Sequence, residues 1–407
     1  MREPIEVIAD LQEDQKPLQT LQDETSTLEL SVVMPCLNES ETLEACIKKA
    51  QRALRAHHIV GEIIVADNGS ADDSCEIAQR LGARLINVDK RGYGSALIAG
   101  IAAARGKYVL MGDADDSYDF AHIPRFLEKL REGFDLVVGN RFEGGIASKA
   151  MPPLHRYLGN PALSWFGRLF FHCPTGDIYC GLRAFNRDAI LRMDLRTTGM
   201  EFAIEMVVKA TLLGLRVGGV PTTLSPGGRS RRPHLRTWLD GWRTLRFMLL
   251  YSPTWLFFYP GALLMLAGLG TALWLLPGPR VVRGVALDAQ TLLYAAMVVL
   301  IGFQAICFAV FARTFAITEH LLPDDALLNR FFRVFTLEKG LAIGASFVLG
   351  GLAGSIYAVY AWSMRGFGNL DFSSTLRVVI PAATAITLGF QIILSSFLVS
   401  LLGLARR

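Results

Sequence analysis

Four long apolar stretches near the C-terminal end carry no charged residue, and they constrain the fold more than any other feature of the sequence. They cover residues 254–276, 289–312, 340–364 and 378–405. Each exceeds the ~20 residues that cross a bilayer as a helix. A buried helix of a globular core would be shorter and would carry a polar stripe. The sequence therefore predicts an α-helical transmembrane domain of four spans over residues 254–407.

Charged residues beside these stretches predict their orientation. Residues 228–247, immediately before the first stretch, contain six arginines against one aspartate. Basic flanks favour the cytoplasmic side of a membrane, and four spans place both chain ends on one side. The outward links 277–288 and 365–377 each hold two arginines, so the charge contrast is modest. We expect cytoplasmic N- and C-termini.

Two segments of different composition lie on either side of residues 29–228. Residues 1–28 are acidic and have no apolar run long enough for a signal peptide, so we expect a disordered acidic extension. In residues 229–253, leucines and tryptophans recur at helical spacing beside arginines. This pattern predicts a basic amphipathic helix that lies in the bilayer interface. Residues 154–171 have a similar pattern, which a core helix would also explain.

Strand-like and helix-like segments alternate between residues 29 and 228. Short apolar runs predict strands over 28–34, 62–66, 84–88, 107–111 and 135–138. Helical spacing predicts helices over 41–57, 72–81, 94–104 and 123–131. This alternation indicates an α/β domain with a mostly parallel sheet, covered by helices on both faces. The glycine pattern of a dinucleotide-binding site does not follow the first strand, and the P-loop pattern does not occur.

Polar residues follow three of the predicted strands, at the edge where ligands bind in such sheets. Asn38 and Glu39 follow the first strand, Asp67 follows the second, and Asp113 and Asp115 follow the fourth. The last two stand two positions apart, so in extended chain both carboxylates can hold one divalent cation. Magnesium commonly takes one or two carboxylates and completes its coordination with water and substrate phosphates. The sequence therefore predicts a metal–phosphate site at this edge.

Local structure is an alternative explanation for the acidic run. Four carboxylates lie within seven positions, and such crowding raises a pKa unless a cation or solvent compensates. Asp116 or Ser117 could cap the helix that we expect next. We assign Asp113 and Asp115 to function and Asp116 to local structure.

The cysteines give little sign of a metal site. The sequence has six, and none are spaced as a CxxC pair. Cytosolic thiols stay reduced, so disulfides are not expected. His172, Cys173 and Cys180 raise the alternative of a zinc site, but no fourth ligand is evident.

Several motifs, in order, resemble the inverting glycosyltransferases of the second sequence family, which have the GT-A fold. They are VVMPCLNE at 32–39, VADNGSAD at 65–72, GDAD at 112–115, VGNRF at 138–142, CGLRAF at 180–185 and GMEF at 199–202. Within that family the chain is similar to polyprenyl-phosphate sugar synthases of the dolichol-phosphate glucose and mannose synthase type. The resemblance covers about residues 29–250 and implies a Rossmann-like GT-A catalytic domain over 29–228.

The resemblance implies roles for residues on the donor side. It places the nucleotide against Pro35, Asn38, Glu39, Asp67, Arg91 and Asp113. Asp113 and Asp115 would hold a divalent cation, Mg²⁺ or Mn²⁺, together with the diphosphate. The sequence departs from the family pattern at Asn68, where a second aspartate is usual, and at Ser117, where mannose synthases commonly have glutamine. The second departure leaves the donor sugar open.

On the acceptor side, the resemblance implies arginines that grip a lipid phosphate: Arg141, Arg156, Arg183 and Arg229. Arg141 and Arg229 would also take part in catalysis. Arg141 or Arg156 could instead form ordinary surface pairs, and Arg183 could brace the sheet through a carboxylate such as Asp177. The run Pro-Gly-Gly before Arg229 gives that segment a hinge, so we expect a mobile lid.

The resemblance implies transfer of one hexose from a nucleotide sugar to polyprenyl phosphate, such as undecaprenyl or dolichol phosphate, with inversion at the anomeric carbon. A phosphate monoester with a second pKa of ~6 is largely dianionic at neutral pH, so the acceptor needs no general base. UDP-glucose is the first choice of donor, with GDP-mannose and UDP-N-acetylhexosamine as alternatives.

Cellular setting and partners complete these expectations. We expect an integral protein of the inner membrane with a cytoplasmic catalytic domain, and no nucleic-acid partner. Small residues around Gly350 and Gly351 would permit close helix packing and a homo-oligomer. A processive polysaccharide synthase is disfavoured, because no QxxRW-like pattern precedes the spans. The non-enzyme alternative is a catalytically inactive sugar-nucleotide module in a membrane protein.

Overall fold

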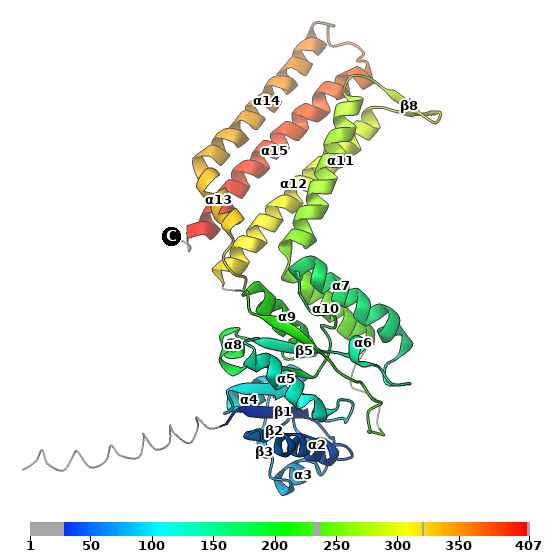
Figure 1. Cartoon of the computed structure of the whole chain (residues 1–407). Coiled ribbons are helices and arrows are strands. Elements are labelled where there is room, and N and C mark those ends of the chain that lie inside the picture. Colours follow the sequence, from blue (N-terminus) through cyan, green and yellow to red (C-terminus); the bar gives the residue numbers. More distant parts are fainter. Residues whose placement is uncertain (1–27, 231–236, 320, 405–407) are drawn as a thin grey trace, which may run out of the picture. The chain divides into compact units, whose positions relative to one another are not determined.

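The computed structural model describes residues 28–230, 237–319 and 321–404 (Figure 1). The predicted acidic extension therefore lies almost wholly outside the described residues. The chain divides into two compact units, Met1–Met248 and Leu249–Arg407. Each unit is described by itself below.

A seven-stranded sheet forms the centre of the first unit. Its strands lie in the order β3, β2, β1, β4, β6, β5, β7. Their bounds are Leu30–Cys36 (β1), Gly61–Asp67 (β2), Arg84–Asn87 (β3), Tyr108–Met111 (β4), Leu136–Asn140 (β5), Arg183–Asn186 (β6) and Val217–Pro221 (β7). β6 runs antiparallel to both of its neighbours, and every other pairing is parallel. The mostly parallel sheet predicted from the sequence is confirmed.

Register aligns the carboxyl ends of the strands that precede the polar residues. Cys36, the last residue of β1, pairs with Asp67, the last residue of β2. Val33 of β1 pairs with Met111, the last residue of β4. The segments that leave these three strands therefore start at one edge of the sheet, as the sequence predicted.

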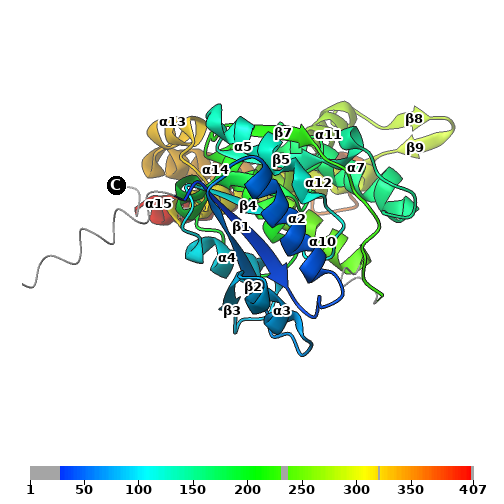
Figure 2. The same cartoon turned by 60° about the horizontal axis from the view of Figure 1, so that its bottom comes forward.

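Helices cover both faces of this sheet. β1 is buried at every position except Pro35, as expected for a strand covered on both sides. Figure 2 shows α2 and α4 on opposite sides of β1, and α4 packs on β1 and β2. The helices are α2 (Leu43–Ala56), α3 (Ser74–Arg80), α4 (Tyr93–Ala103), α5 (Ile123–Arg131), α6 (Arg141–Gly144), α8 (Arg187–Arg192) and α9 (Phe202–Leu212).

The nine strands and helices predicted up to residue 138 are all present, and no end differs by more than two residues. The sequence missed β6 and β7. β6 has only four residues and begins with a charged one, while β7 contains two glycines and a proline, so neither shows a hydrophobic period. Both strands exist because they pair with β5.

Two aromatic helices of the first unit carry exposed apolar side chains. A π-helical turn, η2 (His155–Gly159), leads into α7 (Asn160–Phe171), and α10 spans Thr237–Leu250. Tyr157 is 74% exposed and Trp165 is 51% exposed. A fully buried core helix would hide such residues, but Gly167 and Phe171 of α7 are buried, so this helix packs one side on the unit and exposes the other.

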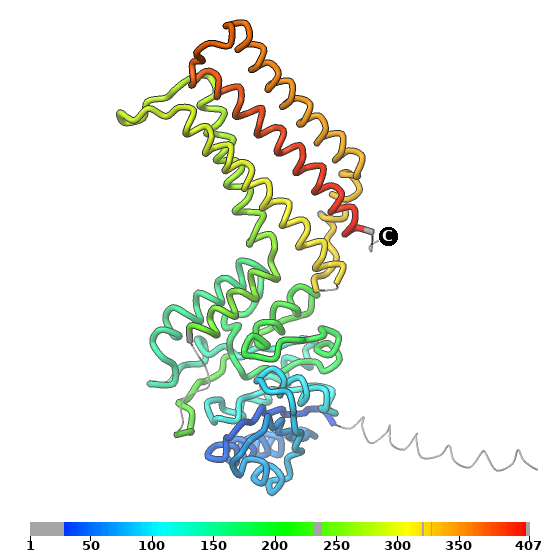
Figure 3. Tube along the Cα trace, turned by 180° about the vertical axis from the view of Figure 1, so that it is seen from behind, coloured from blue at the N-terminus to red at the C-terminus, as the bar shows by residue number. Residues whose placement is uncertain are grey.

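Within its described residues, the second unit contains four helices that are long and apolar enough to cross a membrane, and they coincide with the four predicted stretches. They are α11 (Tyr259–Leu275) with the π-helical turn η3 (Thr254–Phe258), α12 (Ala289–Thr318), α14 (Leu337–Ser363) and α15 (Phe372–Leu404). A short helix, α13 (Ala326–Val334), precedes α14, and the strands β8 (Arg280–Val282) and β9 (Val285–Leu287) form a hairpin between α11 and α12. Figure 3 shows α14 and α15 side by side, and α11 packs against α12.

Glycines allow close approach within both helix pairs. A Cβ at Gly302 of α12 would lie 2.5 Å from the backbone nitrogen of Met265 in α11. A Cβ at Gly351 of α14 would lie 2.5 Å from the carbonyl oxygen of Ala382 in α15, whereas Gly350 has no atom within 4 Å. Only Gly351 of this adjacent pair is thus used in packing within the chain.

Candidate functional site

The loops after β1 and β2 are fastened to each other at the sheet edge. Asn38 has a positive φ of 56°, and its backbone N–H donates to Ser70 Oγ at 2.8 Å. Its side-chain Oδ1 accepts from the Ala71 N–H at 2.7 Å. Asp67 Oδ2 accepts from the N–H groups of Gly69 and Ser70, both at 3.0 Å. Asn38 and Asp67 therefore shape the rim, whatever ligand it binds.

Asn68 organises the neighbouring loop that carries Arg91. Its Nδ2 donates to the carbonyls of Val88 at 3.1 Å and Lys90 at 2.9 Å, and its Oδ1 accepts from the Gly92 N–H at 2.6 Å. An amide can donate and accept at once, while an ionised carboxylate only accepts. Asparagine can therefore make all three bonds, whereas an ionised aspartate could only accept. Arg91 itself is exposed.

The acidic residues after β4 have separate surroundings. Asp113 Oδ1 accepts from the Tyr93 hydroxyl at 3.0 Å. Asp115 Oδ1 accepts from the backbone N–H of Ser117 at 3.1 Å and from its hydroxyl at 2.6 Å. Asp116 has a φ of 60° and pairs with Lys49 at 2.7 Å, so its local role is supported.

The prediction that Asp116 or Ser117 caps the next helix is wrong. Asp119, and not Asp116 or Ser117, caps the turn η1 (Phe120–His122), because its Oδ1 accepts from the Ala121 N–H at 3.0 Å. This turn leads directly into α5. The acidic run thus combines a cap, a turn and two carboxylates that remain at the rim.

Burial and like charge perturb one of these carboxylates. Burial, followed by the negative charge of Asp115, raises the pKa of Asp113 from 3.8 to about 7. The Tyr93 hydrogen bond and the charges of Arg229 and Arg141 act in the opposite direction. A carboxylate pair of this kind favours a further cation, and its hard oxygens suit Mg²⁺ or Mn²⁺.

Protein ligands alone would not complete a metal coordination sphere. Among the described residues there is no group of three or more His, Cys, Asp or Glu side chains that could hold a metal ion. Two carboxylates fit a cation that takes its remaining ligands from water and phosphate. The zinc alternative is wrong, because Cys173 and Cys180 are buried free thiols and no such group includes them or His172.

Arg229 lies among the carboxylates. Its Nη1 is 3.1 Å from Glu39 Oε1 and its Nη2 is 3.0 Å from Asp115 Oδ2. All three side chains are largely buried, with exposures of 18%, 8% and 13% for Arg229, Glu39 and Asp115. The structure thus joins the end of β1, the end of β4 and the segment after β7 through one guanidinium.

Backbone contacts hold the segment before Arg229 across the rim. The Ser225 N–H donates to the carbonyl of Ser117 at 2.9 Å, and the Gly228 N–H donates to the carbonyl of Asp115 at 3.0 Å. A Cβ at Gly227 would lie 3.3 Å from that same carbonyl oxygen. The segment therefore covers the carboxylates in this state.

Arg141 forms a buried ion pair. Its Nε donates to Asp177 Oδ2 at 2.6 Å and its Nη2 donates to Asp177 Oδ1 at 2.8 Å. The exposures are 9% for the Arg141 side chain and 0% for that of Asp177. The pair occupies the Nε–Nη2 edge of the guanidinium, so a further anion would have to approach Nη1.

The expectation for Arg183 requires correction. Its side chain is fully buried, and it donates to the backbone carbonyls of Cys180, Ile178 and Ala203. A guanidinium that saturates carbonyls inside the core is not available to a lipid phosphate. The alternative partner, Asp177, is also wrong, because that carboxylate pairs with Arg141. Arg183 therefore braces β6 and α9.

Arg156 lies apart from these contacts. It belongs to η2 and stacks over the ring of Tyr157 at 5.6 Å from the centroid. The structure therefore brings Glu39, Asp113, Asp115 and Arg229 together and leaves Arg156 on a separate element. Sequence reasoning missed the contact of Tyr93, and it noted Asn68 only as a departure from the family pattern. The only signal for either contact is a polar side chain at a strand or helix end.

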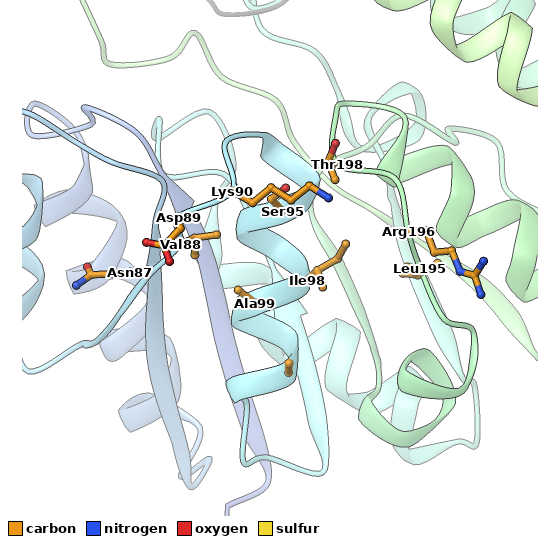
Figure 4. Close-up of a pocket in the computed structure, with 11 residues that line it drawn as sticks. Asn87, Val88, Asp89, Lys90, Ser95, Ile98, Ala99, Leu195, Arg196 and Thr198 are labelled. Carbon is orange, nitrogen blue, oxygen red and sulfur yellow. The ribbon is translucent and has the colours of Figure 1, made fainter.

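A cavity of about 650 Å³ lies along α4. Figure 4 shows Lys90 and Ser95 near Thr198 on one side of it, with Ile98 and Ala99 along the helix. Cations, a carboxylate and aliphatic side chains all line it, so it favours no single ligand chemistry. We place the candidate site at Glu39, Asp113 and Asp115, none of which borders this cavity.

Comparison with known proteins defines the class. The family model for glycosyl transferase family 2 matches residues 31–193, and the model for the C-terminal transmembrane region of that family matches residues 310–403. The "Low-salt glycan biosynthesis hexosyltransferase Agl6" of Haloferax volcanii is 37% identical over 375 residues, which cover 92% of this chain and 89% of the relative. The chain belongs to glycosyltransferase family 2 and is a membrane glycosyltransferase.

Two further matches are more distant. A "Dolichyl-phosphate hexose transferase" of Haloferax volcanii is 29% identical over 194 residues, which cover 47% of this chain and 81% of the relative. A crystal structure of glucosyl-3-phosphoglycerate synthase from Mycobacterium tuberculosis, in complex with Mn²⁺ and UDP, is 22% identical. That match covers 61% of this chain and 85% of the other, with a TM-score of 0.44.

Proposed function

We propose that this glycosyltransferase moves one hexose from a nucleotide sugar to polyprenyl phosphate, with inversion at the anomeric carbon. UDP-glucose is the favoured donor, with GDP-mannose and UDP-N-acetylhexosamine as alternatives. The observation that carries the proposal is the meeting of Asp113, Asp115, Glu39 and Arg229 at the carboxyl edge of the sheet. The names of the two Haloferax relatives agree with hexose transfer, and one of them names a dolichyl phosphate.

On the donor side, Asp113 and Asp115 would hold Mg²⁺ or Mn²⁺. A bound divalent cation supplies neutralisation of the charge that develops on a diphosphate leaving group. Pro35, Asn38, Glu39 and Asp67 would border the nucleoside, and the loop ordered by Asn68 would present Arg91 to the phosphates. The raised pKa of Asp113 and the hard oxygen ligands support this assignment.

On the acceptor side, Arg141 and Arg229 would bind the lipid phosphate, with Arg156 near the membrane. Arginine suits this task because its planar fork pairs bidentately with phosphate oxygens. A dianionic acceptor needs no general base, so the chain's own work is to orient the attacking oxygen and exclude water. Arg229 would exchange its carboxylate partners for the acceptor as the segment over the rim opens.

The proposal extends to the division of the chain into domains and to its orientation in the membrane. We propose the division into a catalytic domain over 29–228, an interface helix over 229–253 and a membrane domain over 254–407. Trp238 is 80% exposed and Trp242 is 56% exposed on α10, in keeping with a helix that rests in the bilayer interface. Basic residues between α12 and α14 favour a cytoplasmic catalytic domain and cytoplasmic termini in an inner membrane.

A transfer assay tests the proposal. Full-length protein would be incubated with labelled UDP-glucose, polyprenyl phosphate and Mg²⁺ or Mn²⁺, and label in organic-extractable lipid would be counted. Asp115→Ala should abolish transfer, while Asp116→Asn, which changes a turn residue paired with Lys49, should retain most of it. Near-normal turnover of Asp115→Ala would refute the metal assignment.

The catalytically inactive module is the competing proposal, and the same assay separates the two. An inactive module would bind nucleotide and cation but give no extractable label with any of the candidate donors. Replacing UDP-glucose with GDP-mannose and UDP-N-acetylhexosamine in parallel reactions also identifies the donor.

A further inference from the structure

Asp113 is held from two directions by residues to which the proposed function gives no role. Tyr93, the first residue of α4, contacts one carboxylate oxygen, and Gly181, in the segment before β6, lies against the other. Neither residue is among the cation ligands assigned above, which are Asp113 and Asp115. Both residues contact the carboxylate of Asp113 and restrict its orientation.

Tyr93 reaches Asp113 because the start of α4 is fixed. The Gly92 N–H donates to Asn68 Oδ1 at 2.6 Å, and the Gly94 N–H donates to the Thr198 carbonyl at 2.9 Å. A Cβ at Gly92 would lie 2.2 Å from that carbonyl oxygen, so the backbone is closely packed there. The tyrosine hydroxyl then donates to Asp113 Oδ1 at 3.0 Å.

Gly181 supplies space on the opposite side of the carboxylate. A Cβ at this position would lie 2.7 Å from Asp113 Oδ2, closer than real side chains approach, and 3.1 Å from Tyr118 Cε2, which is a tight contact. The Gly181 N–H donates to the Tyr118 hydroxyl at 2.8 Å, which fixes the backbone beside Asp113. Its φ is not in the left-handed region, so the absence of a side chain serves the space and not the backbone.

We propose that Tyr93 and Gly181 are positioning residues that set the orientation of Asp113 for cation and diphosphate, an inference that rests on the proposed function. The hydroxyl selects one rotamer by binding Oδ1, and the bare glycine allows Oδ2 to lie against the backbone. A carboxylate oriented in advance loses little freedom when it binds a cation, so affinity depends on both contacts. The Tyr93 bond also ties the loop that carries Arg91 to Asp113.

Binding of Mn²⁺ in the presence of UDP tests the inference without requiring turnover. Free Mn²⁺ is followed by electron paramagnetic resonance during titration of full-length protein in detergent. Removing an outer-shell partner of a metal ligand commonly lowers affinity roughly 10- to 100-fold. Tyr93→Phe should weaken Mn²⁺ binding by about 10-fold, and kcat at saturating Mn²⁺ should change far less than the Mn²⁺ requirement.

Matched controls separate positioning from general damage. Tyr108→Phe removes a hydroxyl at the other end of β4 and should leave Mn²⁺ affinity unchanged. Gly181→Ala should weaken binding more than Tyr93→Phe, whereas Gly219→Ala, whose Cβ would meet nothing closer than 3.7 Å, should not. An unchanged thermal midpoint for Tyr93→Phe shows that the fold is intact.

Each outcome decides the inference. Unaltered Mn²⁺ affinity in Tyr93→Phe overturns it, and so does a wild-type protein that binds no Mn²⁺ with UDP. If the wild type binds Mn²⁺ and UDP but transfers no sugar to lipid, the proposed function fails. The affinity ratio between wild type and Tyr93→Phe still decides the positioning role in that case.

Discussion

The buried pair between Arg141 and Asp177 should contribute strongly to the stability of the first unit. Asp177→Asn removes the charge that faces the Arg141 guanidinium at 2.6 and 2.8 Å, and presents an amide in its place. Because both side chains are almost fully buried, water cannot replace the lost partner. Breaking one partner of a buried pair costs roughly 3–5 kcal/mol.

The cost converts to a measurable shift in thermal midpoint. For a domain of about 150–250 residues, 1 kcal/mol corresponds to roughly 2–4 °C. Asp177→Asn should therefore lower the midpoint of the first unit by about 6–20 °C in detergent. Asp194→Asn serves as the control, because the pair of Asp194 with Arg196 is exposed and such pairs contribute about 0–1 kcal/mol.

A double variant distinguishes the pair from its surroundings. Arg141→Met with Asp177→Leu replaces both charges by apolar groups, which is often neutral or stabilising for a buried pair. We expect the thermal midpoint of the double variant to be higher than that of Asp177→Asn. A midpoint for Asp177→Asn within 2 °C of the wild type, or a double variant that falls below it, would refute the reasoning.

Two further predictions concern the donor side. The pKa of Asp113 is about 7 in the folded chain and 3.8 ordinarily, so the folded state binds that proton more tightly than the unfolded state does. The free energy of unfolding therefore falls as pH rises from about 4 to 7. With divalent cations removed by a chelator, Asp113→Asn should have a higher free energy of unfolding than the wild type at pH 7.5. This difference should shrink by about 2–3 kcal/mol at pH 5. A difference that does not depend on pH contradicts the prediction. Asn68→Asp loses the two bonds to the Val88 and Lys90 carbonyls, which at roughly 1 kcal/mol each amount to about 2 kcal/mol. The KM for nucleotide sugar should therefore rise about 30-fold with little change in kcat. The exposed Asn87→Asp is its control, and equal KM values for the two variants would count against the role of Asn68.

The apolar pattern of the sequence was sufficient to predict the elements whose buried residues form a continuous run or a regular stripe. The strand Leu30–Cys36 and the helix Ile123–Arg131 follow directly from apolar spacing, and the charge-free stretches identified the spans. The edge that carries Asp67 and Asp113 followed from strand order, since parallel strands deliver their ends to one rim.

Charge partners were beyond such reasoning. Arg141 and Arg183 occupy similar motifs, yet one pairs with Asp177 and the other saturates backbone carbonyls. Which arginine meets the carboxylate depends on β6 running antiparallel, and that strand has no hydrophobic period. Likewise, the bond of Tyr93 to Asp113 depends on how α4 packs, because the two residues lie 20 positions apart.

The reversed direction of β6 has a consequence for how such chains diversify. β5 ends at Asn140 and β6 begins at Arg183, and the two strands are antiparallel neighbours. Everything between them, including η2 and α7, is therefore one long hairpin connection. An excursion of this kind can lengthen, shorten or be exchanged while the strand register on either side stays fixed. Evolution can thus change η2 and α7 independently of the rim formed by β1, β2 and β4.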